Sequence, residues 1–493
     1  MKKLLYIFAS FLFVFEANAQ TLADVIRYSQ SNLQGTARAT AMGNAFGSLG
    51  GDFTSLSINP AGLGVYRSDE LSFTTTYSKK DVDANYLGVN SKESTSLLSI
   101  PNVGYVAALK TSSNKSSLIN VNLGVGFNRL NNFKIHRYVS GNNAQSSMLD
   151  SFAEIANSVG NSDQFDRFYE KAAWDTYMLD YDDNSQLFSH KIADGNYGQN
   201  QIKSFSQSGY VNEYNFSFGL NFNHKVYAGF SLGVHDVYFK ETTEMCEFDP
   251  GNRFNNFDEY SFYTYLKTEG VGVNGKFGVI FKPINELRLG FALHTPTFYN
   301  LDDYYYNDMT SIAANNGVMN NYSYNSPEGE FEYTLQTPWK AVLSASFVSE
   351  FGLISLDCDF IDYSTSKLRS NGSLMRDDND LISQSFKPVA NIHVGGEYKV
   401  TDSFSLRAGA EYLPGPYNKT INGVDQINGT SKTYTYSGGL GWRSSNFFID
   451  LAYKYYTDNH YVDIYIPSST NPVAPTRFKD TFNFLSLTLG FRF

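Results

Sequence analysis

Cysteine is nearly absent from this chain of 493 residues, in which only Cys246 and Cys358 occur. Two cysteines exclude a fold that is held together by a framework of disulfides. A single bridge between the two remains open, although the pattern around residue 358 places Cys358 on the outward face of a strand. Cysteine therefore contributes little to the stability that we expect for this chain.

An excess of positive charge is also missing. Lysine and arginine together number 38, against 49 aspartates and glutamates, and the formal net charge is -11. Such a chain lacks the basic surface with which nucleic acid is bound. We expect no nucleic-acid partner.

Long apolar runs are limited to the N-terminus. The chain starts with Lys2 and Lys3, is apolar from Leu4 to Phe15, and reaches an Ala17-x-Ala19 site before Gln20. This order is typical of a secretory signal peptide, which we predict over residues 1–19. The apolar core is shorter than the ~20 residues that a spanning helix needs.

Motifs for catalysis and for cofactors are missing as well. The sequence contains no Ser-His-Asp motif, no zinc-ligand spacing and no phosphate-binding loop, and its seven histidines are scattered. We therefore predict no enzyme activity, no cofactor and no metal site. Catalytic residues that are distant in sequence would leave no motif, so a hydrolase embedded in the fold stays open as an alternative.

Aromatic residues are abundant, with 40 Phe and 36 Tyr, and much of the chain alternates with a period of two. Apolar side chains alternate with polar or small ones, which in a strand places the two kinds on opposite faces. We predict fourteen strands near residues 69–78, 101–111, 117–128, 211–223, 225–240, 262–282, 285–298, 331–348, 351–363, 387–400, 402–413, 431–443, 446–457 and 481–493.

The connections between these segments alternate in length. Short turns are expected at 112–116, 224, 283–284, 349–350, 401 and 444–445, and long loops at 79–100, 129–210, 241–261, 299–330, 364–386, 414–430 and 458–480. Short turns on one side and long loops on the other are typical of outer-membrane barrels. The sequence therefore predicts an all-β fold: a 14-stranded antiparallel transmembrane β-barrel over residues 69–493, in contact with lipid of the bacterial outer membrane.

The last strand supports this assignment. Leucines and aromatic residues alternate with polar ones from Leu485 to Phe493, where the chain ends. This ending resembles the signature that the barrel assembly machinery reads, so that machinery is an expected partner through Phe493.

Residues 20–68 do not alternate. They begin with a helix signal, Thr21 followed by Asp24, and continue into a small-residue run from Gly35 to Gly51 and the segment Asn59-Pro60-Ala61-Gly62-Leu63. Small residues allow close packing but form no long regular element. We predict a compact N-terminal plug whose small and apolar residues need a partner surface.

A family resemblance appears at this point. The stretch Ala37–Gly47 followed by Ser57–Leu63 is similar to the N-terminal region of the outer-membrane transporters for long-chain fatty acids and aromatic hydrocarbons. The resemblance implies a helical plug, or hatch, that bears the Asn-Pro-Ala-Gly-Leu segment inside a fourteen-stranded barrel. Members with this N-terminus are also labelled hemin receptors, but no residue here supports heme binding.

Ligand contacts are expected on the plug and on the inner wall. Apolar plug residues offer a surface for a hydrophobic small molecule, and an inward arginine is the best match for a carboxylate. The expected ligand-binding residues are Phe53, Leu56, Ile58, Asn59, Pro60, Ala61, Arg288 and Arg407. For Asn59 we weigh a latch that binds the barrel wall against a structural turn, two readings that overlap.

The resemblance also suggests an exit for ligand through the barrel wall. Gly124 and Gly126 share one face of the third strand, and glycine in a strand often marks a bulge where ladder hydrogen bonds are lost. The alternative is that both glycines only make room for plug side chains.

These observations predict an outer-membrane transport protein that passes small hydrophobic or amphipathic molecules, such as long-chain fatty acids, by diffusion through a plugged barrel. Two alternatives stay open. One is an adhesion or structural surface protein that acts through the loop at 129–210, and the other is a barrel-embedded lipid hydrolase.

Overall fold

The computed structural model describes residues 22–111, 117–194, 196–421 and 424–493. The predicted signal peptide at 1–19 and the short turn predicted at 112–116 lie outside the described residues. No helix among the described residues is long and apolar enough to cross a membrane.

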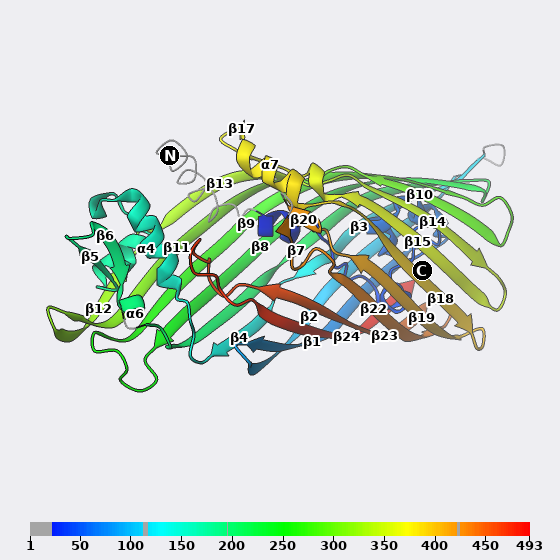
Figure 1. Ribbon diagram of the computed structural model, residues 1–493. Coiled ribbons are helices and arrows are strands. Elements are labelled where there is room, and N and C mark those ends of the chain that lie inside the picture. The colour runs from blue at the N-terminus through cyan, green and yellow to red at the C-terminus, as the bar shows by residue number, and fades with distance from the viewer. Residues whose placement is uncertain (1–21, 112–116, 195, 422–423) are drawn as a thin grey trace.

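The sheet closes on itself. Strand β1 (Glu70–Tyr86) pairs with β2 (Val89–Lys110) on one side and with β24 (Thr476–Arg492) on the other, so the first and last wall strands join. The wall is a closed antiparallel barrel of fourteen strands, as the sequence predicted. Figure 1 shows the strands running obliquely along a long barrel, with the C-terminus near one end.

Seven further wall strands are single elements. They are β7 (Asn200–Phe222), β8 (Val226–Phe248), β9 (Phe257–Phe281), β18 (Pro388–Lys399), β19 (Phe404–Pro414), β22 (Lys432–Arg443) and β23 (Phe447–Val462).

Four wall strands are interrupted along their length. They are β3 (Leu118–Asn132) with β4 (Ile135–Gly141), β10 (Leu287–His294) with β11 (Phe298–Asn315), β13 (Gly329–Gln336) with β14 (Lys340–Val348), and β15 (Gly352–Asp362) with β16 (Lys367–Ser370). Smaller elements complete the loops: β12 (Val318–Asn325), η3 (Tyr363–Thr365), β17 (Ser373–Leu374), α7 (Arg376–Ser385), β20 (Thr420–Ile421) and β21 (Val424–Asp425).

Side chains alternate across the wall because successive strand residues point to opposite faces. On β1, Leu71, Phe73 and Tyr77 are exposed, whereas Ser72 and Thr74 are buried in the lumen. The same alternation exposes apolar side chains on every neighbouring wall strand near the short-turn end. Outward apolar side chains of this kind face lipid in outer-membrane barrels, and we call this band of side chains the lipid belt.

The five short turns among the described residues lie where the sequence predicted them, but the long connection expected at 79–100 is wrong. Strands β1 and β2 continue through most of it and meet at a two-residue turn, Leu87-Gly88, where φ is 46° and 80°. Two positive φ values suit the tight turn of a hairpin. The sequence hides this extension because the strands become polar on their outward face above the lipid belt, so the apolar period ends before the strands do.

The loop expected at 129–210 is also wrong, since most of it is ordered structure. Beyond β4 the chain forms α4 (Met148–Val159), η2 (Ser162–Gln164), α5 (Glu170–Asp175), β5 (Leu179–Asp182), β6 (Leu187–His190) and α6 (Lys191–Asp194), and then returns as β7. We call residues 142–194 and 196–199 the cap. Figure 1 shows the cap at the end of the barrel opposite the short turns.

The N-terminal segment lies inside the lumen. Residues 22–29 are helical, and α2 (Ala37–Ala41), α3 (Ser55–Ile58) and η1 (Pro60–Val65) follow. Almost every side chain from Gly35 to Gly64 is buried, and its apolar contacts include wall residues such as Val106, Ala292 and Val342. We call residues 22–65 the plug.

Candidate functional site

The Asn59-Pro60-Ala61 segment both starts a turn and contacts the wall. The Asn59 side chain accepts a hydrogen bond from the Ala61 amide at 3.0 Å, which caps η1. Its amide group donates to Gly47 O at 2.6 Å within the plug and to Phe291 O at 3.3 Å on β10. Gly278 on β9 lies directly against it, where a Cβ would overlap the side chain. The two readings of this segment, latch and turn, therefore describe one arrangement.

A chain of buried charges joins the plug to the opposite wall. Arg38 of α2 donates to Glu397 at 3.0 Å, and Arg407 binds Glu397 at 2.6 Å and Asp450 at 2.5 Å. The expectation that Arg407 binds a ligand carboxylate is wrong, because its buried guanidinium is already paired with these two carboxylates. Buried charges are stable only when they are paired in this way.

Arg288 is also occupied by the plug. Its guanidinium donates to Leu49 O at 2.7 Å, below the open part of the lumen. The prediction that Arg288 binds ligand stays a prediction. Arg288 contacts the plug directly, whereas Arg407 pairs with Glu397, the wall partner of the plug residue Arg38.

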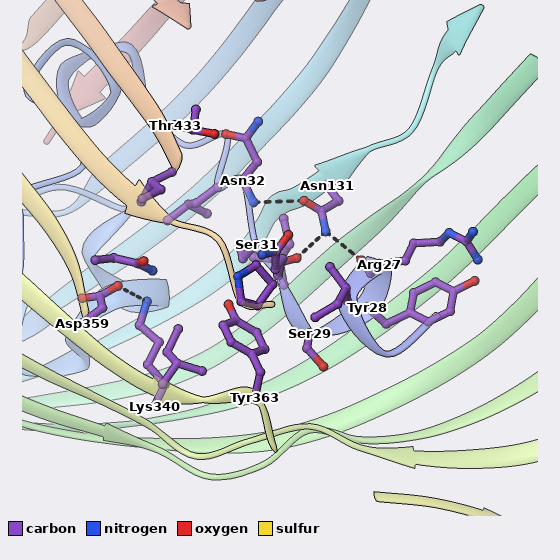
Figure 2. Close-up of a pocket in the computed structure, with 18 of the residues that line it drawn as sticks. Arg27, Tyr28, Ser29, Ser31, Asn32, Asn131, Lys340, Asp359, Tyr363 and Thr433 are labelled. Carbon is purple, nitrogen blue, oxygen red and sulfur yellow. Dashed lines mark hydrogen bonds and ion pairs between the residues drawn. The ribbon is translucent and has the colours of Figure 1, made fainter. Parts of the chain in front are cut away.

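A cavity of about 680 Å³ lies in the lumen above the plug. Figure 2 shows plug residues Arg27 to Asn32 on one side of it and wall residues Lys340, Asp359 and Tyr363 on another. A volume of this size is within the usual range for small-molecule sites. Of the predicted ligand-binding residues, only Ile58 lines the cavity.

The other predicted plug residues pack away from the cavity. Phe53 and Leu56 are fully buried against β2 and β3, where they contact Gly104 and Gly124. Pro60 and Ala61 pack against Gly229 on β8. Phe53, Leu56, Asn59, Pro60 and Ala61 therefore hold the plug in place, and the expectation that they form the ligand surface is wrong.

Part of the cavity lining is apolar. Ile26 and Leu33 of the plug meet wall residues that include Leu130, Phe133 and Ile361. Tyr28 and Phe133 pack edge to face, with ring centroids 6.4 Å apart. This part of the lining offers the surface that a hydrocarbon chain or ring needs.

The rest of the lining includes paired charges. Lys276 binds Glu213 and Lys340 binds Asp359, and His294 contacts Ile58 O at 2.8 Å. A lysine ammonium has three donors, and the carboxylate of each pair leaves further donors for a bound anion. The cavity lining thus combines hydrocarbon with paired charges, and Lys340 lies beside the apolar Ile361 as its cross-strand partner.

The bulge expected at Gly124 and Gly126 is not present. The β3 register runs without a shift from Asn120 to Asn128 against both β2 and β7. A Cβ at Gly124 would meet Leu56 and Leu63, and one at Gly126 would meet Phe53 and β2 backbone. The idea that these glycines open the wall is wrong, and the alternative holds: they make room for the plug.

The backbone ladder between the second and third wall strands, β2 and β3, ends above Gly124 and Gly126. The last paired residues are Asn102 on β2 and Asn128 on β3. Above them β4 pairs with β7, and no backbone pairing joins β4 to β2 among the described strands. We call this unpaired stretch, residues 89–101 facing 129–141, the seam.

The plug occupies the lower part of the seam. The Asn32 amide donates to Leu130 O at 2.9 Å, and the Gln34 amide donates to Arg129 O at 2.8 Å. These bonds satisfy carbonyl groups of the third strand that have no partner on β2. Residues 32–34 therefore close the ladder in the place of β2.

Sequence reasoning missed most of the cavity. Lys276 and Lys340 face inward by simple alternation, since the neighbouring Phe277 and Trp339 are exposed, so the period of two was a usable signal for both. Residues 26–33 carried no such signal, because their position in the lumen depends on how the plug folds.

Comparison with known proteins assigns the chain to a protein family. Residues 194–465 match a protein-family model described as outer membrane protein transport protein (OMPP1/FadL/TodX). The chain belongs to this family. The match covers more than half of the sequence and confirms the resemblance seen at the N-terminus, so the protein is a transport protein of the bacterial outer membrane.

Solved structures of this family share the fold. A FadL homologue from Pseudomonas aeruginosa superposes with a TM-score of 0.56 at 13% identity, covering 94% of this chain and 99% of that chain. The Pseudomonas putida toluene transporter TodX gives 0.52 at 12% identity, with 94% and 99% covered. The Ralstonia pickettii toluene transporter TbuX gives 0.50 at 12% identity, again with 94% and 99% covered. No curated protein matches the sequence.

Proposed function

We propose that this protein passes small hydrophobic or amphipathic molecules inward through the cavity above the plug, by diffusion and without chemical change. The observation that carries the proposal is the cavity itself, whose lining includes the apolar residues Leu130, Phe133 and Ile361 and the cations Lys276 and Lys340. A long-chain fatty acid has the matching chemistry, an apolar chain and a carboxylate. Aromatic hydrocarbons would use the apolar part of the lining alone.

We propose the seam as the exit from the cavity. Leu130 and Phe133 belong both to the cavity lining and to the seam. Across the seam, Leu98 and Ile100 of β2 are 70% and 46% exposed, at the upper edge of the lipid belt. An apolar ligand that passes between these residues enters lipid directly and avoids water. Plug residues 32–34 close this path, so their release from the third strand would open it.

A disulfide between the plug and the third strand tests this route. Gln34 and Arg129 are bridge partners, a spacing that a disulfide can span. The double variant Gln34→Cys with Arg129→Cys is made with both native cysteines changed to serine. Uptake of radiolabelled oleate and of toluene is measured in cells that lack other transporters, before and after oxidation.

We expect oxidation to lower uptake at least ten-fold and a reductant to restore it. A matched control links Leu440→Cys with Leu451→Cys, outward partners on β22 and β23, and should transport normally in both states. Unchanged uptake in the locked plug variant would reject the seam. Uptake by the wild type no faster than by cells without the protein would reject the transport proposal itself.

We also propose that the assembly machinery binds the last strand through Phe493. This side chain is 67% exposed at the short-turn end, and its backbone pairs with Asp69. Because β24 closes the barrel against β1, it is free to bind another protein only before closure. Phe493→Ala should lower the amount of folded barrel in the membrane, measured by heat-dependent gel mobility.

A further inference from the structure

The outer wall continues far above the lipid belt. On β9 the outward apolar residues end at Val271, and the strand continues up to Phe257. Fourteen strand residues correspond to roughly 45 Å along the strand. The outward face of β8, β9 and β11 in this region is no longer aliphatic but carries tyrosines, lysines and carboxylates.

The tyrosines are stacked on one another. Tyr265 on β9 and Tyr306 on β11 lie with ring centroids 4.8 Å apart and planes inclined by 12°. Tyr263 and Tyr304 extend the group, with centroids 6.2 Å from Tyr306 and Tyr265 respectively. We call Tyr263, Tyr265, Tyr304 and Tyr306 the tyrosine face.

Two lysines lie over this face. The Lys240 ammonium is 4.9 Å from the Tyr265 ring centroid, and the Lys267 ammonium is 5.8 Å from that of Tyr304. Lys267 also pairs with Glu269 at 3.2 Å. The face thus combines flat rings, cations and a carboxylate, with little aliphatic surface.

A groove of about 370 Å³ adjoins the tyrosine face at Tyr263. Its polar lining comes from the wall strands β2, β4, β7 and β8, and it includes His136, Tyr138, Ser204, Ser206, Thr242, Glu244 and Glu93. Ser261 donates to Glu244 at 2.8 Å, which fixes that carboxylate at the edge of the groove. Hydroxyl and carboxylate groups here stand beside aromatic rings.

We propose that the tyrosine face and its groove bind the sugar headgroup of a glycolipid in the outer leaflet of the same membrane. Aromatic rings present a negative face, against which the C–H groups of a sugar ring stack. Hydroxyls and carboxylates then bind the sugar hydroxyls, and Lys240 and Lys267 meet headgroup phosphates.

The position of the tyrosine face on the barrel favours a glycolipid as its partner. The face lies directly above the lipid belt on the same strands that present Leu232, Val271 and Phe298 to lipid. A lipid whose acyl chains contact that belt places its headgroup against this part of the wall. The charged residues within the face also disfavour a protein partner, since the core of a protein interface is depleted of Lys, Glu and Asp.

Binding of purified glycolipids to the detergent-solubilised full chain tests the proposal. The probes are lipopolysaccharide with its core sugars and lipid A without them, and bound lipid is counted by native mass spectrometry. The variants are Tyr263→Ala with Tyr265→Ala, and Tyr263→Phe with Tyr265→Phe, which keeps the ring faces. A control pair, Tyr434→Ala with Tyr436→Ala, removes outward tyrosines of β22 that are 45% and 59% exposed.

We expect the alanine pair to bind the core-bearing lipid at least ten-fold more weakly, while the phenylalanine pair and the control stay within two-fold of the wild type. Lipid A should bind all four proteins alike and more weakly than the core-bearing lipid. The proposal is overturned if the alanine pair binds the core-bearing lipid as the wild type does, or if lipid A binds the wild type as tightly as the complete glycolipid. Heat-dependent gel mobility confirms that each variant is folded.

Discussion

The plug and the cap lie at opposite ends of one barrel, but their apolar contacts are arranged differently. The buried residues of the plug divide into small groups, each completed by wall residues such as Val106 or Ala292. The cap residues Leu149 and Phe152 belong to one large apolar cluster, which wall residues such as Phe262 also complete. Both regions therefore depend on the wall, the plug through several separate contacts and the cap through one continuous one.

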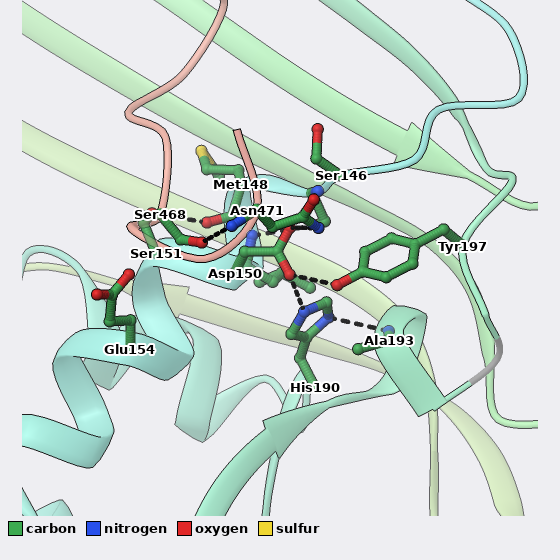
Figure 3. A network of polar contacts seen from close by, with 12 residues as sticks. Ser146, Met148, Asp150, Ser151, Glu154, His190, Ala193, Tyr197, Ser468 and Asn471 are labelled. Atoms are coloured by element: carbon green, nitrogen blue, oxygen red, sulfur yellow. Dashed lines mark hydrogen bonds and ion pairs between the residues drawn. The ribbon is translucent and has the colours of Figure 1, made fainter. Parts of the chain in front are cut away.

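The polar contacts of the plug and of the cap also differ. Arg38 binds the wall carboxylate Glu397, so one polar anchor of the plug is a charge pair with the barrel. In the cap, Figure 3 shows Asp150 at the centre of a network that joins α4, the region around α6 and the β23–β24 loop. One Asp150 oxygen accepts from Tyr197 at 2.5 Å and contacts the His190 ring at 2.8 Å, and the other accepts from Asn471 at 2.9 Å.

The largest effect should come from the buried wall charges to which Arg38 of the plug is joined. Arg407→Met leaves Glu397 and Asp450 without their shared partner in a buried site. Removing one member of a buried ion pair costs about 3 to 5 kcal/mol. Urea unfolding followed by heat-dependent gel mobility should show this loss for the barrel with its plug.

The control for that variant is Arg477→Met, since Arg477 is exposed on β24. It should leave the urea midpoint within error. Equal loss in both variants would mean that the buried network contributes nothing specific.

A cavity in the cap core should cost slightly less and stay local. Leu149 is fully buried in α4, and Leu→Ala in a core costs about 3 kcal/mol. Hydrogen exchange should accelerate in the cap and remain unchanged in β18 and β19. Leu187→Ala, at an exposed cap position, serves as the control. Exchange that also accelerates in the plug would contradict the local effect expected for this variant.

Loss of the N-cap residue of helix α2 in the plug should lower stability less. Thr36 starts α2, where its side chain accepts from the Ala39 amide at 3.2 Å and donates to Asp52 at 2.8 Å. Replacing an N-cap threonine by alanine costs about 1 kcal/mol. Thr36→Ala should raise hydrogen exchange in α2, whereas Thr310→Ala on the exposed outer wall should change nothing. A wild-type exchange rate in α2 would show that the wall alone orders the plug.

The smallest expected effect is the response of the cap to acid. Burial raises the pKa of the Asp150 carboxyl, but hydrogen bonds from His190, Tyr197 and the Ser147 amide outweigh it and bring the pKa below its ordinary 3.8. A lowered folded pKa stabilises the cap above pH ~4, and this contribution is lost as the pH falls through the folded value. Hydrogen exchange in α4 should therefore accelerate below pH 4, and less so in Asp150→Asn. Parallel pH profiles for the two proteins would contradict this role.

The barrel could be predicted from sequence because its membrane part repeats a simple physical rule. Lipid on one side and polar groups on the other force the alternation seen at Leu451 and Asp450, and the closing strand ends at Phe493. Above the lipid belt the outward face of β1 is polar, and its inward residues Val82 and Ala84 pack into the cap cluster. The apolar outward pattern therefore ends although the strands continue. The cap was missed because its short helices and strands carry no long period.

The candidate site was predicted less well for a different reason. Arg407 points inward, as alternation required, but its pairing with Glu397 and Asp450 is a three-dimensional fact that no local pattern contains. The plug motif identified the family correctly, yet its residues Phe53 and Leu56 stabilise the plug and do not face the cavity. The alternation in the sequence predicts whether a wall residue faces inward or outward. The fold of the plug then determines which part of the inner face borders the cavity.

The most direct test of transport through the cavity is a crystal structure with a brominated long-chain fatty acid, located by the anomalous signal of bromine. We predict bromine inside the barrel, between Leu130 and Phe133 on one side and Ile361 on the other, with the carboxylate near Lys276 or Lys340. Bromine found only on the outer lipid belt, with the cavity free of ligand, would contradict the account.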